Sequence, residues 1–108
     1  MEDSRLMQSM LLDFYGDLLT EKQRECCSMY FNEDLSLSEI AEQRGISRQG
    51  VWDMIRRAEL TMTELEAKTG LVRRFLERNA EIDAIERELR AAGTLTDSVL
   101  QKLEDLKI

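Results

Sequence analysis

The sequence predicts an all-α protein built around a helix-turn-helix bundle. Three observations support this: none of the 108 residues is proline, apolar residues recur at steps of three and four, and 43% of residues are hydrophobic while 34% are charged. These features are typical of a foldable helical domain. A chain of this length can build one modest core. We therefore expect a helix-turn-helix domain over residues 1–70 and a helical hairpin over residues 71–108.

Two helices are expected in the first 34 residues, where they would cover the motif that follows. Ser4 can cap a first helix, which Gly16 weakens near its end. Thr20 and Gln23 have the spacing of a capping box, which predicts the start of a second helix that stops near residues 32–34. The apolar residues of the first helix are Leu6, Met7, Met10, Leu11, Phe14, Leu18 and Leu19. Those expected to point inward from the second are Cys26, Cys27, Tyr30 and Phe31.

The two cysteines are adjacent in the sequence. Neighbouring Cα atoms lie about 3.8 Å apart, which is below the usual range for a disulfide. We expect reduced thiols, at least one of them packed in the core.

Residues 35–58, LSLSEIAEQRGISRQGVWDMIRRA, have the pattern of a helix-turn-helix. Ser36 and Glu39 form a second capping-box pattern, which opens a short helix with Leu37, Ile40 and Ala41 on its buried side. Gly45 supplies the left-handed residue that ends this helix, and Ser47 caps the next. The apolar stripe of that next helix continues through Val51, Ile55 and Ala58.

The apolar stripe runs on past the motif, at alternating steps of four and three. It comprises Val51, Ile55, Ala58, Met62, Leu65, Thr69, Val72 and Leu76. We place a helix end at residues 68–70 and a fifth helix from Leu71 to a stop at Gly93, although a single glycine costs only about 1 kcal/mol and would permit one continuous helix. Thr94 or Thr96 caps a final helix. The resulting hairpin packs back on the long helix or pairs with a second copy.

Charge is distributed unevenly, with 15 basic and 22 acidic residues and a net charge of -7. Residues 35–58 are the only segment with a positive sum, because four arginines stand against three carboxylates there. Histidine is absent, so the commonest general base and transition-metal ligand is missing. The acidic residues also lack the loop pattern of a calcium site. We expect no enzyme activity, small-molecule substrate, cofactor or metal.

No stretch approaches the roughly 18 consecutive apolar residues that a membrane span needs, and the N-terminus has no signal-peptide pattern. We expect a cytoplasmic protein without membrane contact.

The helix that begins after Ser47 is the candidate site for binding DNA or RNA. Arg48 could pair with guanine and Gln49 with adenine. Three further arginines could contact phosphates. Gly50, Trp52 and Asp53 are poor groups for reading bases or contacting phosphates. The candidate nucleic-acid-binding residues are Arg44, Ser47, Arg48, Gln49, Trp52, Arg56 and Arg57.

Two other interpretations of this surface stay open. It could bind a protein, because exposed tryptophan and arginine are enriched at protein interfaces, or it could be a packing unit only. The hairpin could also cover Trp52. A second basic cluster, Arg73, Arg74 and Arg78, is either a solvated face or an extension of a phosphate-binding stripe from Arg56 and Arg57.

The segments LLDFYGDLLTEKQRE, DLSLSEIAEQRGISRQGVWDMIRRAE and KTGLV resemble, in order, the YlxM family of small bacterial helix-turn-helix proteins. The match covers nearly the first 76 residues, and the phrase from Asp13 to Gln23 is its specific part. Gly50 and Trp52 stand where the family usually has alanine and tyrosine.

The resemblance implies a fold similar to region four of bacterial sigma factors, extended by C-terminal helices, and a homodimer. Because the family's genes commonly lie beside those of the signal recognition particle, it also implies regulation of, or accessory binding to, that particle. A targeting GTPase is an alternative partner if no nucleic acid is bound.

Overall fold

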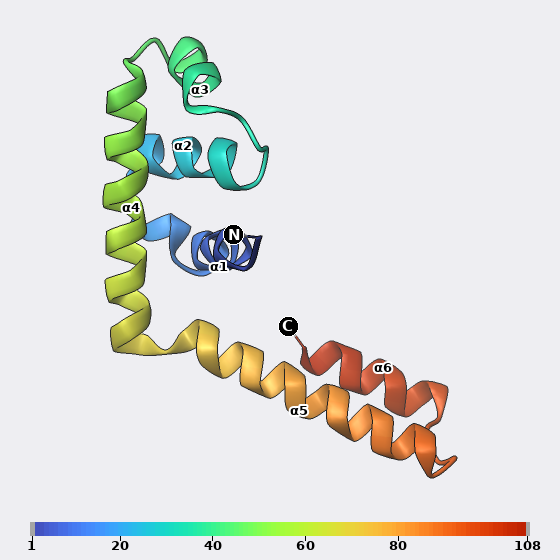
Figure 1. The fold of residues 1–108 in the computed structure, drawn as a ribbon. Helices are drawn as coiled ribbons and strands as arrows, with labels where there is room; N and C mark the ends of the chain where they lie inside the picture. The colour runs from blue at the N-terminus through green and yellow to red at the C-terminus, as the bar shows by residue number, and fades with distance from the viewer. Residues whose placement is uncertain (1, 108) are drawn as a thin grey trace. The chain divides into compact units, whose positions relative to one another are not determined.

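A computed structural model describes residues 2–107, and no strand occurs among them. The prediction of an all-α protein is therefore confirmed. The structure divides into two compact units, Met1–Gly70 and Leu71–Ile108. The helices, drawn in Figure 1, are α1 (Glu2–Tyr15), the 3-10 turn η1 (Gly16–Leu18), α2 (Glu21–Phe31), α3 (Leu37–Arg44), α4 (Arg48–Thr69), α5 (Leu71–Ala91) and α6 (Asp97–Leu106).

The long helix α4 is the central element of the first unit. Helices α1, α2 and α3 all contact it, and Figure 1 shows them beside successive parts of its length. Val51, Ile55, Ala58 and Met62 are each 0% exposed. Their spacing places them on one face of α4, where full burial of a large apolar side chain contributes about 1.5–3 kcal/mol. This face fixes which side chains of α4 point outward.

The predicted starts of α2, α3 and α4 and the predicted end of α3 are confirmed. Thr20 with Gln23, and Ser36 with Glu39, form complete capping boxes in which each side chain bonds the other residue's backbone N–H. Gly45 has φ 68° and ends α3 in the left-handed conformation. The backbone N–H of Gly50 donates to Ser47 Oγ at 2.9 Å, so Ser47 caps α4.

The N-terminal helix differs from the prediction in its start and in its buried face. Ser4 does not cap α1, because the helix already begins at Glu2. Leu6 and Leu18 are 65% and 68% exposed, although both belong to the predicted apolar stripe. A repeat at steps of three and four identifies a broad apolar face, but the neighbouring helices decide how much of it is covered. The buried residues here are Leu11, Leu12, Tyr15, Gly16 and Leu19.

In α2, Cys26 and Cys27 are buried as free thiols, as predicted, and Met29 is buried with them. Tyr30 and Phe31 are only half-buried, so their predicted inward orientation is only partly correct. Their rings meet edge to face, with centroids 5.1 Å apart. A tyrosine or phenylalanine at the edge of a core keeps part of its ring in solvent while still packing.

The C-terminal end of α4 is tied to α1. The Tyr15 hydroxyl donates to Glu66 Oε1 at 2.6 Å and also forms a hydrogen bond with Thr69 Oγ1. Gly70 then adopts φ 63°, and its N–H bonds the Glu66 carbonyl. A continuous helix across Gly70 is therefore excluded. Leu76, the last residue of the predicted apolar stripe, is 40% exposed.

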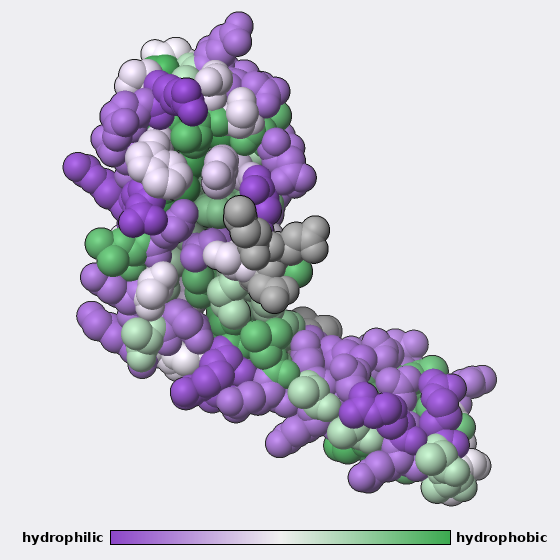
Figure 2. Space-filling view, viewed as in Figure 1, coloured by the Kyte–Doolittle hydropathy of each residue, from purple (hydrophilic) through white to green (hydrophobic). Residues whose placement is uncertain are grey.

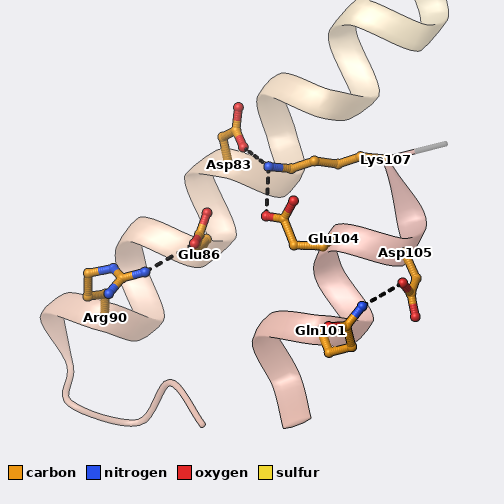
Figure 3. Close-up of polar contacts among 7 residues, drawn as sticks. All are labelled: Asp83, Glu86, Arg90, Gln101, Glu104, Asp105 and Lys107. Atoms are coloured by element: carbon orange, nitrogen blue, oxygen red, sulfur yellow. Dashed lines mark hydrogen bonds and ion pairs between the residues drawn. The ribbon is translucent and has the colours of Figure 1, made fainter. Parts of the chain in front are cut away.

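The second unit is a pair of adjacent helices, α5 and α6 (Figure 1). Ile82 and Leu103 are buried in it. Of the two candidate caps, Thr96 is the one that accepts the Val99 N–H, at 3.2 Å. Lys107 Nζ lies 2.6 Å from Asp83 Oδ1 and 3.1 Å from Glu104 Oε1, which joins the end of α6 to the middle of α5 (Figure 3).

Hydrophilic side chains cover most of the surface visible in Figure 2, with smaller hydrophobic areas between them. Across residues 2–107, no helix combines the length and apolar character that crossing a membrane requires.

Replacing Gly45 with alanine should lower the free energy of unfolding by about 1–2 kcal/mol, the cost of a left-handed conformation for a residue with a Cβ. A Cβ at this position meets no atom within 4 Å, so backbone strain is the expected cause. Urea denaturation measures the change. Gln43→Ala, an exposed change in the same helix, should stay within about 0.5 kcal/mol. Equal effects of the two changes would contradict the assignment.

Stability should also fall at alkaline pH because of Cys27. Burial, followed by the nearby Cys26 and Glu59, raises the pKa of the Cys27 thiol from 9.0 to about 12. Between these values the unfolded chain loses a proton that the folded chain keeps, so the free energy of unfolding decreases as pH rises from about 9 towards 12. Urea denaturation at a series of alkaline pH values tests this. The Cys27→Ala variant should show a shallower decline, and an unchanged slope would refute the assignment.

Candidate functional site

The helix-turn-helix of α3 and α4 presents all seven candidate residues on the surface of the first unit. The buried positions of α4 face the other helices, so the remaining positions of its first turns point outward. Trp52, the one aromatic residue among the seven, is 37% exposed. The exposed candidates are Arg44, Ser47, Arg48, Gln49, Trp52, Arg56 and Arg57.

Arg48 and Arg57 are the least constrained cations of this surface. Among the side chains of residues 4–107, no carboxylate forms an ion pair with either arginine. Arg48 is the first residue of α4, next to the Ser47 cap. Both guanidinium groups are thus available to an anionic ligand.

Arg44 is already engaged. Its guanidinium forms an ion pair with Glu25 of α2, and both side chains are about one-third exposed. The pair joins the end of α3 to α2. Any anionic ligand would have to compete with the Glu25 carboxylate for Arg44.

Gln49 and Arg56 also have partners on α4 itself. Gln49 Nε2 donates to Asp53 Oδ1 at 3.0 Å. Arg56 lies 4.0 Å from Glu59 Oε2, and its guanidinium carbon lies 5.5 Å from the centroid of the Trp52 ring. Residues three and four apart on a helix are neighbours, so these contacts follow from spacing that the sequence contains.

The carboxylates beside the site reduce its positive potential. Burial raises the pKa of Glu59, and the charge of Arg56 opposes that shift. At the start of α3, the backbone and side-chain hydrogen bonds of Ser36 lower the pKa of Glu39, so this group stays ionised at neutral pH. The four arginines of residues 35–58 therefore act against three acidic groups. The positive surface is small.

The tertiary structure adds residues that the sequence analysis did not assign to the site. Leu37, expected to be buried, is half-exposed and lines a shallow hollow of about 520 Å³ with Arg48, Gln49 and Trp52. Lys22 of α2 lines a second shallow hollow with Arg57. No local pattern predicts the position of Lys22, because α2 and α4 are brought together only by packing.

Neither a metal-binding cluster nor a reactive thiol is found among the side chains that the structure describes. No group of three or more Cys, Asp or Glu side chains within residues 4–107 is arranged to hold a metal ion. Burial raises the pKa values of Cys26 and Cys27, which keeps both thiols protonated and poorly nucleophilic at neutral pH. The groups exposed at the motif are instead guanidinium, amide, hydroxyl and indole groups.

Comparison with known proteins agrees with this geometry. Residues 2–103 match the family described as "Putative helix-turn-helix protein, YlxM / p13 like". A UPF0122 protein of Thermoanaerobacter sp. (strain X514) is 48% identical over 87 residues, which are 81% of this chain and 74% of the relative. A relative in Listeria innocua is 39% identical over 99 residues, or 92% and 90% of the two chains.

A third relative, in Acetivibrio thermocellus, is 43% identical over 100 residues, which are 93% of this chain and 82% of the relative. The match to the family model extends well beyond the first 76 residues, through α5 and into α6. The chain therefore belongs to the YlxM/p13-like helix-turn-helix family, UPF0122.

Proposed function

We propose that this protein is a non-enzymatic regulatory or accessory factor that binds nucleic acid through the N-terminal turns of α4. The observation that carries the proposal is the joint exposure of Arg48, Arg56 and Arg57 on the one segment whose charge is positive. Guanidinium groups are suited to phosphate and guanine, because their N–H groups match both geometrically. The short α3 and the turn at Gly45 give α4 the setting of a recognition helix.

The acidic body suits a selective and weak binder. A small positive area can dock locally, while the net charge of -7 repels unrelated phosphates over longer distances. Because few phosphates can be neutralised, contacts other than charge have to supply much of the affinity.

The proposed setting for this binding is the signal recognition particle pathway in the bacterial cytoplasm. Its basis is the family's gene neighbourhood, not the chemistry of the site. In this setting the ligand is the particle's RNA or a DNA site that controls its genes. A homodimer, formed through the hairpin of residues 71–108, would double the number of basic contacts.

A second candidate function is protein binding without nucleic acid, for example docking on a targeting GTPase. The observation that favours it is that three candidates already have intramolecular partners: Arg44 with Glu25, Gln49 with Asp53, and Arg56 with Glu59. Trp52 and Ile46 are also each 37% exposed. Aromatic and arginine side chains are enriched at protein interfaces.

The combined variant Arg48→Ala, Arg56→Ala and Arg57→Ala tests the main proposal. It should abolish or strongly weaken nucleic-acid binding and reduce the slope of log K against log salt by about three, because three phosphate contacts are lost. Fluorescence anisotropy of a labelled oligonucleotide at several salt concentrations measures both effects.

The matched control replaces Arg87, Arg90 and Lys102 with alanine. These residues are exposed in the second unit, and their loss changes the net charge by the same three units. The control should bind almost as well as the parent. If both triple variants lose binding equally, overall charge explains the loss and the α4 site is wrong. If the parent binds no DNA or RNA, while a pull-down recovers a partner despite RNase treatment, the protein-binding alternative stands.

Glu25→Gln should tighten nucleic-acid binding by a few-fold, because it removes the carboxylate that holds Arg44. If Arg44 then contacts a phosphate, the salt slope should increase by up to about one unit. Glu42→Gln is the control. Glu42 is exposed and lies two residues before Arg44, so its substitution removes the same charge without breaking the Arg44–Glu25 ion pair. Equal effects of the two changes would show that Arg44 makes no separate contribution.

A further inference from the structure

Trp52 occupies the centre of an exposed row on α4, between Arg48 and Arg56. The steps of four residues place these three side chains on one side of the helix. Trp52 is 37% exposed, and the guanidinium carbon of Arg56 lies 5.5 Å from the centroid of its ring. An indole ring that contacts Arg56 and follows Arg48 one helical turn later is a flat apolar surface between two cations.

A shallow hollow adjoins this ring. It has a volume of about 520 Å³ and is lined by Leu37, Arg48, Gln49 and Trp52. The lining combines an aliphatic side chain, an aromatic ring, an amide and a cation. Such a set suits a planar ligand that is apolar on its faces, polar at its edge and attached to an anion.

Recognition of base edges in a DNA duplex does not account well for an exposed tryptophan at the centre of this surface. In the major groove, base edges are recognised by side chains that donate and accept hydrogen bonds in the plane of the base. The indole offers a single donor there, and the amide of Gln49 already donates to Asp53. In single strands, loops and bulges, by contrast, unpaired bases stack on aromatic rings and guanidinium planes.

Base stacking would also supply affinity that the small positive charge of the site does not. Residues 35–58 contain only one more basic than acidic group, so phosphate contacts alone give little affinity. Stacking does not depend on net charge and therefore adds affinity that salt does not remove.

We propose that Trp52 is a stacking platform for an unpaired nucleobase, with Arg48 positioned to bind the adjacent phosphate. This inference rests on the proposed nucleic-acid function and specifies its ligand: a single-stranded segment, loop or bulge in place of a regular duplex. Trp52 determines specificity for unpaired bases, and the arginines supply the attraction to the backbone.

Intrinsic fluorescence gives a direct test, because Trp52 is the only tryptophan of the chain. The probes are single-stranded RNA and DNA of one sequence and about 12 nucleotides, within the usual site sizes of roughly 4–16 nucleotides, together with their duplexes. An abasic strand of the same length carries the phosphates without bases. Quenching of Trp52 fluorescence should accompany binding of the intact single strands, and the abasic strand and duplexes should bind weakly without it. Comparing RNA with DNA identifies the natural source of the base.

Labelled-oligonucleotide anisotropy then measures the variants. Trp52→Ala should weaken single-strand binding by about 5- to 150-fold, the range expected for one stacked base, and Trp52→Phe should retain part of it. Leu60→Ala is the matched control, because Leu60 is an exposed apolar residue of the same helix that does not line the hollow. It should bind like the parent. Circular dichroism checks that all variants remain helical.

Each failure has a separate meaning. If single strands bind without quenching Trp52 fluorescence, the stacking role is wrong. It is also wrong if Trp52→Ala binds single strands as tightly as the parent. Either result leaves the proposed nucleic-acid function in place. If duplexes bind more tightly than single strands, the stacking role is wrong and recognition in a duplex groove takes its place. If the parent binds none of the probes, both proposals fall.

Discussion

Burial of one face of α4 is the constraint on which the first unit depends. Val51, Ile55, Ala58 and Met62 lose all contact with solvent against α1, α2 and α3. Two short motif helices alone could not bury enough surface to be stable. The N-terminal helices are therefore a structural requirement of the motif, and their burial of α4 fixes the direction of every outward side chain on it.

The exposed side of the same helix follows from this burial. Once the inner face is occupied, Arg48, Trp52 and Arg56 form a row on the outside, and the Ser47 cap holds the first turn in register. Neighbouring carboxylates restrain the same surface: Glu59 lies beside Arg56 of the row, and Asp53 accepts a hydrogen bond from Gln49. The surface thus combines accessible cations with local restraints, which favours a ligand that brings both a phosphate and an apolar face.

Local sequence patterns predicted the framework of the fold well. The capping boxes at Thr20 and Ser36, the left-handed Gly45 and the helix end before Gly70 lie where they were expected. Each of these signals involves residues within one helical turn, so no knowledge of the distant chain is needed. The start of α1 was the exception, because Ser4 has the right chemistry for a cap but lies inside the helix.

The sequence by itself determined the helices, their ends and the outward position of the arginines, because caps, glycines and apolar spacing act over a few residues. Only the tertiary structure decided that Arg44 pairs with Glu25, that Leu37 borders the hollow beside Trp52, and that Leu6 stays exposed. Periodicity identifies an apolar face without naming what covers it. Contacts between distant segments depend on how the helices pack, and no local pattern specifies that.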